Sequence, residues 1–302
     1  MTIQWYPGHM ARAKRQIEAS LKVVDIVFEL VDARAPLSSR NPTIDEIVGR
    51  KPRLVLLNKA DLADPAATEA WCGHFRACGL AALAIDALGG AGVQDIPGQV
   101  REQLRERFER QIRKGMKPRP ARAIIVGIPN VGKSALINRL AGRRAALTGD
   151  RPGVTKGKQW IRTGGDLELL DTPGILWPKF EDPRVGYFLA ALGSIREEIL
   201  PVEEVACYVL PHLAERYGGA LKERYGLDDV PSALPDMAAA AEILEQIGRK
   251  RGCLAAGGGV DLAKAGGVLL RDLRSGKLGR ITLELPEEAG GATPGTNGHS
   301  VR

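Results

Sequence analysis

Apolar and polar residues follow two different patterns along the chain. Short apolar runs, rich in Val, Ile and Leu, predict buried strands at 23–31, 53–57, 121–126 and 167–170. Segments with a helical pattern separate these runs, at 11–21, 100–113 and 135–140. Because strands that alternate with helices favour a mainly parallel sheet flanked by helices, the first part of the chain predicts an α/β domain.

The pattern becomes mostly helical in the remaining part of the chain. The predicted helices there span 202–217, 237–251 and 261–275, and a terminal strand is expected at 281–285. Gly, Pro, Thr and Ser then dominate, which indicates a disordered tail. We therefore expect an α/β domain over 1–178, a smaller helical domain over 179–285, and a tail over 286–302.

A glycine-rich turn between a predicted strand and a predicted helix carries the clearest chemical signal. The spacing G-x-x-x-x-G-K-S is matched by Gly127-Ile-Pro-Asn130-Val131-Gly132-Lys133-Ser134, and Ala135 follows. Glycines at these positions let backbone amides wrap phosphate oxygens, while Lys133 neutralises the β- and γ-phosphates and Ser134 ligates Mg²⁺. The N-terminus of the next helix then faces the phosphates. The turn predicts a nucleoside triphosphate site.

A second motif suits recognition of guanine. Asn58-Lys59-Ala60-Asp61 follows the strand at 53–57, at the end of the strand where open α/β sheets bind ligands. Asp61 can accept hydrogen bonds from the guanine N1–H and 2-amino group, Asn58 can hold the adjoining loop, and Lys59 can stack along the base. A solvated Asn-Lys turn would look the same, but beside a phosphate loop the motif indicates a guanine nucleotide, GTP or GDP.

A third apolar stretch ends at Asp86 and Ala87. This position suits a backbone contact to the guanine carbonyl, so both residues are expected in the base pocket. Asp86 stands where GTPases usually have Ser.

The order of the motifs is inverted relative to ordinary GTPases, in which the phosphate loop precedes the base-reading motif. Here Asn58–Asp61 comes first and Gly127–Ser134 second. The inversion predicts a circularly permuted G domain, whose old termini are joined across a connector at 94–120. The basic residues of this connector are either a solvated helix face or a contact for RNA.

The remaining phosphate-sensing elements follow the phosphate loop in their usual order. Asp171-Thr172-Pro173-Gly174 suggests Mg²⁺ held by Asp171 through water and a γ-phosphate bound by the Gly174 amide. Thr155 lies in an earlier loop and can join the Mg²⁺ shell when a γ-phosphate is present. Ile175 occupies the position of the Gln that orients the attacking water in signalling GTPases, so hydrolysis needs another group.

Two residues are candidates for a role in hydrolysis that compensates for the missing Gln. Asn130 inside the phosphate loop offers a neutral oxygen beside the phosphates, which suits a K⁺ ion in place of an arginine finger; the alternative is that Asn130 simply caps a turn. His9 lies in a Gly-containing N-terminal segment and titrates near neutrality. A single N-terminal His is usually inert, and both interpretations stay open.

The chain resembles the ribosome biogenesis GTPase A family, also called YlqF, a circularly permuted GTPase of the TRAFAC class. The resemblance reaches about residue 285 and rests on the inverted order together with Tyr6-Pro-Gly-His9-Met10, Asp32-Ala-Arg34-Ala-Pro36 and Arg40-Asn41-Pro42. It implies a bacterial GTPase that acts late in assembly of the large (50S) ribosomal subunit, binds ribosomal RNA on the immature particle and is stimulated by it. It also favours His9 as a substitute for the missing Gln.

Composition agrees with a polyanionic partner. The 302 residues carry a net charge of +7, and basic residues cluster in the helical part: Arg249, Lys250, Arg251, Lys264, Arg271, Arg274, Lys277 and Arg280. They either hold RNA phosphates or serve solubility. Neither a membrane-spanning run nor a signal-peptide core is evident, so we expect a cytoplasmic protein, and a monomer. Cys72, Cys78, Cys207 and Cys253 lack metal-ligand spacing and are expected as free thiols.

Two other functions compete with ribosome assembly. A signalling GTPase read by protein effectors would not need the basic helical part. An RNA chaperone could keep the nucleotide site for stability alone, and would then work without Lys133 once folded. Neither accounts for the motif order together with the N-terminal segment.

Overall fold

The computed structural model describes residues 15, 17–117, 119–142, 160–163, 167–170, 180, 182–195, 199–255 and 257–289. The functional residues predicted at His9, Thr155, Asp171 and Gly174 lie outside these ranges. The described residues form two compact units. The sheet unit comprises residues up to 61, 65–170 and 284–289, and the helical unit comprises 62–64 and 180–283.

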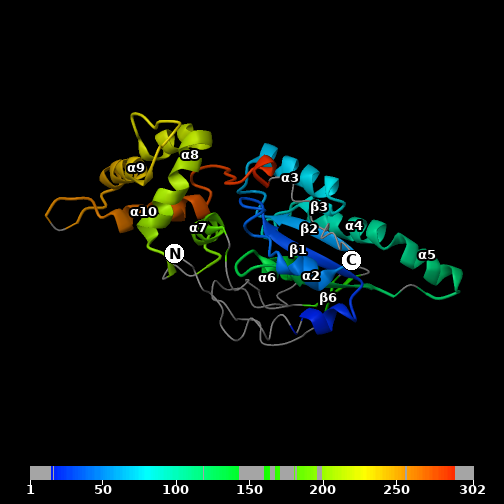
Figure 1. Ribbon diagram of the computed structural model, residues 1–302. Helices are drawn as coiled ribbons and strands as arrows, with labels where there is room; N and C mark the ends of the chain where they lie inside the picture. Colours follow the sequence, from blue (N-terminus) through cyan, green and yellow to red (C-terminus); the bar gives the residue numbers. More distant parts are fainter. Residues whose placement is uncertain are drawn as a thin grey trace, which may run out of the picture. The chain divides into compact units, whose positions relative to one another are not determined.

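Six strands form the sheet (Figure 1). They are β1 (Ile26–Asp32), β2 (Arg53–Asn58), β3 (Ala81–Ala84), β4 (Ala121–Val126), β5 (Trp160–Arg162) and β6 (Leu167–Leu170). Their order is β3-β2-β1-β4-β6-β5, and every neighbouring pair is parallel except β5 with β6. Every residue of β1 and β2 is buried, as expected for central strands covered on both faces. The predicted α/β fold with a mainly parallel sheet is confirmed.

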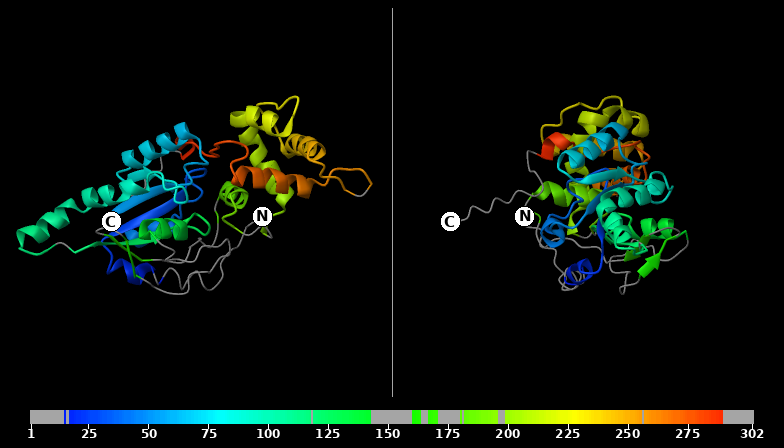
Figure 2. Two further views of the ribbon diagram at one scale, coloured as in Figure 1. Left: turned by 180° about the vertical axis from the view of Figure 1, so that it is seen from behind. Right: turned by 90° about the vertical axis from the view of Figure 1, so that its right-hand side faces the viewer.

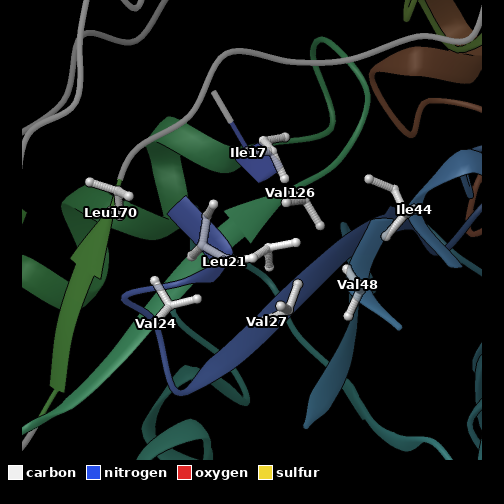
Figure 3. Packing of buried hydrophobic residues seen from close by; sticks show 9 residues of the cluster. Ile17, Leu21, Val24, Val27, Ile44, Val48, Val126 and Leu170 are labelled. Atoms are coloured by element: carbon white, nitrogen blue, oxygen red, sulfur yellow. The ribbon is translucent and has the colours of Figure 1, made fainter. Parts of the chain in front are cut away.

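Helices of the sheet unit pack against this sheet. They are α2 (Thr43–Val48), α3 (Pro65–Ala77), α4 (Ile96–Gln103), α6 (Lys133–Ala141) and the short 3-10 helix η1 (Val93–Asp95). A further helix, α5 (Arg105–Arg113), continues from α4 and has no buried residue. One layer of the core joins α2 and the helical residues 17–21 to the sheet. Figure 3 shows Ile44 and Val48 of α2 on one side of this layer and Ile17 and Leu21 on the other, with Val27 of β1 between them.

The helical unit contains four helices: α7 (Pro183–Ala191), α8 (Val202–Tyr225), α9 (Met237–Lys250) and α10 (Leu262–Arg274). Aspartate side chains accept hydrogen bonds from backbone amides at the N-termini of α7, α9 and α10, through Asp182, Asp236 and Asp261. The three helices predicted in this part correspond to α8, α9 and α10, whereas α7 was not predicted. α8 continues past the predicted end at 217 to Tyr225, with a kink at Tyr217.

Residues 281–285 do not form the predicted strand. The amide and the carbonyl of Thr282 both bond to the phenol of Tyr217, at 3.1 and 3.2 Å, and the Thr282 hydroxyl accepts from the amide of Asp64 at 3.1 Å. Ile281 donates to the Leu62 carbonyl at 2.9 Å. Side chains thus satisfy backbone groups that a ladder would otherwise use.

The beginning of the predicted tail is ordered. Residues Pro286–Ala289 form a 3-10 helix, η3, that contacts α3. Just before it, the carbonyl of Glu284 accepts a hydrogen bond from the indole of Trp71 at 2.9 Å. This tertiary contact, which composition does not reveal, explains why residues 286–289 are ordered although a disordered tail was predicted.

Two predicted absences concern membranes and cysteines. Within the described part of the chain, none of the helices combines the length and apolarity that crossing a bilayer requires. The four cysteines are free thiols.

Candidate functional site

The carboxyl ends of neighbouring parallel strands meet at one edge of the sheet. Asp32, the last residue of β1, pairs in register with Asn58, the last residue of β2. On the other side of β1 lies β4, which ends at Val126 directly before Gly127. The two motifs predicted to bind phosphate and guanine therefore begin at the same edge, where α/β sheets bind ligands.

The turn after β4 requires glycine at two positions. A Cβ at Gly127 would lie 2.6 Å from the carbonyl oxygen of Leu30 in β1, so a side chain there would collide with the neighbouring strand. Gly132 has φ +106°, and a Cβ would lie 2.1 Å from Nδ2 of Asn58. Both glycines let the turn approach β1 and β2 closely.

Lys133 begins α6 and is buried. Its Nζ donates to the carbonyls of Gly127, at 3.2 Å, and Ile128, at 2.7 Å, so the ammonium lies within the curve of the turn. Ser134 and Ala135 follow in the first turn of α6. Among the described residues no side chain caps this N-terminus, whose amides and dipole suit a phosphate.

Asn58 connects three segments of the site. Its Nδ2 donates to the carbonyl of Val131 at 2.7 Å, and its Oδ1 accepts from the amide of Ala87 at 2.9 Å. The side chain is buried, so both bonds are shielded from water. Asn58 thereby fixes two segments beside the end of β2. They are the loop after β3 and the turn at Gly127–Gly132, which was predicted to bind phosphate and is called the phosphate turn below.

Lys59 makes a second link to the phosphate turn. Its Nζ donates to the carbonyl of Asn130 at 3.0 Å and lies 3.0 Å from Oδ2 of Asp32. Lys59 and Asn130 both adopt left-handed backbone conformations, with φ of 62° and 58°. Such conformations in non-glycine residues cluster at ligand sites. The next residue, Ala60, donates to the carbonyl of Ile85 at 3.1 Å, and Asp61 is exposed.

A buried ion pair lies beneath these residues. Asp32, fully buried, accepts from Nε and a terminal nitrogen of Arg34 at 2.9 and 2.8 Å. Burial alone would raise the pKa of Asp32, but attraction to Arg34 and Lys59 outweighs it and holds the pKa well below its usual range. Burial lowers the pKa of Arg34, while Asp32 and, more weakly, Asp61 raise it, with a net increase. Arg34 is thus electrostatically coupled to the predicted guanine reader.

Sequence patterns alone did not assign Asp32 and Arg34 a role at the site. A usable signal exists, because Asp32 ends a fully buried strand at the ligand-binding edge of the sheet.

Asp86 shapes the loop after β3. Its Oδ1 accepts from the amides of Leu88 and Gly89, both at 2.8 Å, and its backbone carbonyl accepts from Gly90 at 2.7 Å. A carboxylate accepts two amide bonds at once, which a serine hydroxyl does less well. The Asp in place of the usual Ser therefore has a structural reason, and it positions Ala87 against Asn58.

Comparison with known proteins agrees with this geometry. Residues 122–218 match the model of a family described as "50S ribosome-binding GTPase". A protein from Priestia megaterium named ribosome biogenesis GTPase A is 54% identical over 96% of this chain and 99% of its own length. The mouse mitochondrial ribosome-associated GTPase 1 is 33% identical over 93% of this chain and 90% of its own.

A solved structure is similar over nearly the whole chain. The crystal structure of GNP-bound YlqF from Thermotoga maritima has a TM-score of 0.62 and 30% identity, and covers 91% of this chain and 99% of that one. High identity over almost the full length, together with the inverted order of the two motifs at one edge of the sheet, establishes the family. The protein belongs to the ribosome biogenesis GTPase A family.

Proposed function

We propose that this ribosome-assembly GTPase binds the immature large (50S) ribosomal subunit and its ribosomal RNA, acts late in assembly, and is released by GTP hydrolysis. The observation that carries the nucleotide-binding part is the Asn58 link, which fixes the phosphate turn and the loop after β3 beside each other at the carboxyl ends of the strands. Relatives named for ribosome assembly and ribosome association support the choice of particle.

The residues at the carboxyl ends of β1, β2 and β4 suit guanine and phosphates through separate groups. Asp61, exposed at the end of the base-reading motif, would accept from the guanine N1–H and 2-amino group. Lys59, tied to Asp32, would lie along the base, and Asn58, Ala60, Asp86 and Ala87 would complete its surroundings. The amides of Asn130, Val131, Gly132, Ser134 and Ala135 would bind phosphate oxygens, with Lys133 as their counter-charge.

The described residues fit a Mg²⁺ ion. Ser134 places a partly buried hydroxyl in the first turn of α6, next to Lys133. Mg²⁺ bound with a nucleotide takes few protein ligands and keeps several waters, so one hydroxyl at this point is sufficient from the described part of the site. Asp171 and Thr155 are proposed as the other contributors, and Gly174 as a γ-phosphate ligand. The ion would neutralise charge that develops on the phosphates.

Turnover is proposed to depend on K⁺, on His9 and on the particle. Asn130 supports the K⁺ proposal because its left-handed backbone places it where the phosphate turn meets Lys59. His9 is proposed to orient the attacking water, since Ile175 lacks a polar group. The chain would work as a monomer in the cytoplasm, where bacterial ribosomes are assembled.

Side-chain hydrogen bonds distinguish two groups among the basic residues of the helical unit. Arg274 donates to the carbonyls of Ala190 and Ala191, both at 2.8 Å, and Arg280 donates to Ala63, so these two arginines support the fold. The other six are exposed and are proposed to meet RNA phosphates, although Arg251 also donates to the carbonyl of Arg224: Arg249, Lys250, Arg251, Lys264, Arg271 and Lys277. In the chain, residues 171–174 directly precede this unit, so γ-phosphate contacts there would favour its RNA-binding state.

The test is GTP turnover in potassium and in sodium buffer, with and without purified large subunits, using Lys133→Ala as the inactive control. We expect stimulation by subunits and a further dependence on potassium. Turnover that ignores subunits would favour a signalling GTPase. Binding to the precursor should be tighter with a non-hydrolysable GTP analogue than with GDP, and equal affinities would contradict release by hydrolysis.

A further inference from the structure

A groove of about 500 Å³ lies at the amino ends of the strands. The predicted nucleotide site lies at their carboxyl ends. The groove is formed by α4, α5, Lys117 and Arg119, with Leu167 at the start of β6. Leu167 pairs in register with Ala121, the first residue of β4, so the groove lies at the amino ends of these strands. It is therefore separate from the edge that carries Asn58 and Gly132.

One face of α5 lines the groove and makes few other contacts. Its lining residues Arg105, Phe108, Glu109 and Ile112 recur at helical spacing, and no residue of α5 is buried among the described residues. Ile112 is 61% exposed. In two opposite views α5 extends beyond the sheet (Figure 1 and Figure 2). The helix thus presents an apolar strip, Ile112 and part of Phe108, that the described part of its own unit leaves partly uncovered. The Arg107 guanidinium lies over the Phe108 ring, 5.4 Å from its centroid, and leaves the other face of the ring for a ligand.

Cations surround this apolar strip. Arg101, Arg105, Lys117 and Arg119 line the groove against a single acidic residue, Glu109. Arg119 is held in place by Asp25, with its two terminal nitrogens 2.9 and 3.0 Å from the carboxylate oxygens. A partner that fits must carry closely spaced negative charges and flat or apolar groups. The volume of the groove is within the range of pockets that bind small organic groups.

We infer that this groove binds single-stranded RNA, with an unpaired base against Phe108 and Ile112 and the flanking phosphates on the cationic rim. Such RNA combines phosphates with bases that stack on aromatic and apolar side chains. The choice of RNA over an acidic peptide rests on the proposed function, because a ribosomal precursor presents RNA as its main anion. The groove then gives the protein an RNA contact in addition to the basic helical unit.

The first test measures binding of a fluorescent single-stranded oligouridine to the full chain by anisotropy. The variant Arg101→Glu/Arg105→Glu reverses two charges at the groove, and Arg110→Glu/Arg113→Glu reverses two on α5 that do not line it. Both change the net charge equally, and the Arg105 pair with Glu102, at 3.5 Å, is exposed and contributes little. We expect affinity to fall about tenfold or more in the first variant and at most about threefold in the second.

A second pair of variants tests the apolar contact. Ile112→Ser removes an exposed apolar group from the groove, while Val23→Ser removes one that is 49% exposed outside it. Only the first should weaken oligouridine binding, by about fivefold or more. Photoreactive thiouridine in the same oligonucleotide should crosslink to residues 97–119.

Several results would overturn the inference. Wild-type chain without oligouridine affinity, equal losses in the two charge variants, or crosslinks confined to the helical unit would each do so. An acidic amphipathic peptide that binds in an Arg101- and Arg105-dependent manner, without RNA crosslinks, would assign the groove to a protein. Subunit-stimulated turnover is measured in parallel: its absence would contradict the proposed function, whereas crosslinks to 97–119 would still support this RNA site.

Discussion

The side-chain amide of Asn58 donates to the carbonyl of Val131 at 2.7 Å, although the two residues are 73 positions apart in the chain. The same side chain accepts from Ala87, so one buried amide supports both the phosphate turn and the base loop. This relationship explains why the first residue of the base-reading motif matters even without touching the base.

Asn58→Ala should weaken GDP binding much more than a comparable buried change elsewhere. It leaves the Val131 carbonyl and the Ala87 amide without this partner, at about 1–3 kcal/mol. Because GDP binding must then restore the order of both loops, affinity should fall by roughly five- to 150-fold. A fluorescent GDP analogue would measure it. Asn41→Ala is the control, because the buried Asn41 side chain accepts from the Thr43 amide and hydroxyl, two residues away. Equal affinities in the two variants would refute the linking role of Asn58.

Gly132→Ala should abolish tight nucleotide binding because it displaces the same side-chain amide, that of Asn58. The added Cβ would lie 2.1 Å from Nδ2 of Asn58, so the side chain must leave Val131. Gly142→Ala is the matched control, since φ is also positive, at +63°, but the Cβ meets no described atom within 4 Å. Both should lose about 1–2 kcal/mol of stability from backbone strain. Calorimetric titration with GDP should separate them, and wild-type affinity in Gly132→Ala would contradict the close approach.

Asp32→Asn should destabilise the sheet unit by about 3–5 kcal/mol, because it removes the buried negative charge that pairs with Arg34 and Lys59. Urea unfolding followed by circular dichroism would measure the loss. Glu69→Gln is the control, since it removes an exposed ion pair with Arg76 and should change stability by less than about 1 kcal/mol.

The same carboxylate predicts a dependence of stability on pH. Because the folded-state pKa of Asp32 lies below its unfolded value, its contribution is fully present above about pH 4 and is lost as pH falls through the folded-state pKa. Wild type should therefore lose more stability than Asp32→Asn when unfolding is compared at pH 6 and in the acid range below about pH 4. Parallel curves for the two proteins would argue against the depressed pKa.

Glu284→Ala should loosen the end of the described chain from the sheet unit. The buried Glu284 carboxylate accepts from the amides of Leu37, at 2.8 Å, and Ser38, at 3.1 Å, and from the Ser38 hydroxyl. Its removal leaves these donors buried, which costs at least about 1–3 kcal/mol. Limited proteolysis should then cut near residues 284–289 sooner than in wild type. The exposed Glu287 provides the control variant, Glu287→Ala, which should digest like wild type.

Local patterns predicted the elements with the strongest signals. The apolar runs became β1, β2, β4 and β6, and Asp261 caps α10 as its position suggests. The connector helix was predicted as one piece, but it divides at Leu104, which is buried while every residue of α5 remains partly or fully exposed. Whether a helix continues or breaks there depends on packing, which periodicity does not describe.

The sequence by itself was enough to predict the chemistry of the site, because spacing within Gly127–Ser134 and within Asn58–Asp61 indicates which groups would meet phosphate and base. It also determined the α/β class and the inverted motif order. Only the tertiary structure decided that Asn58 bonds Val131, that Asp32 lies under Lys59, and that Glu284 binds Ser38 from 246 residues away. These contacts depend on strand register and sheet order, which arise from packing of distant segments, and local residue preferences carry no information about them.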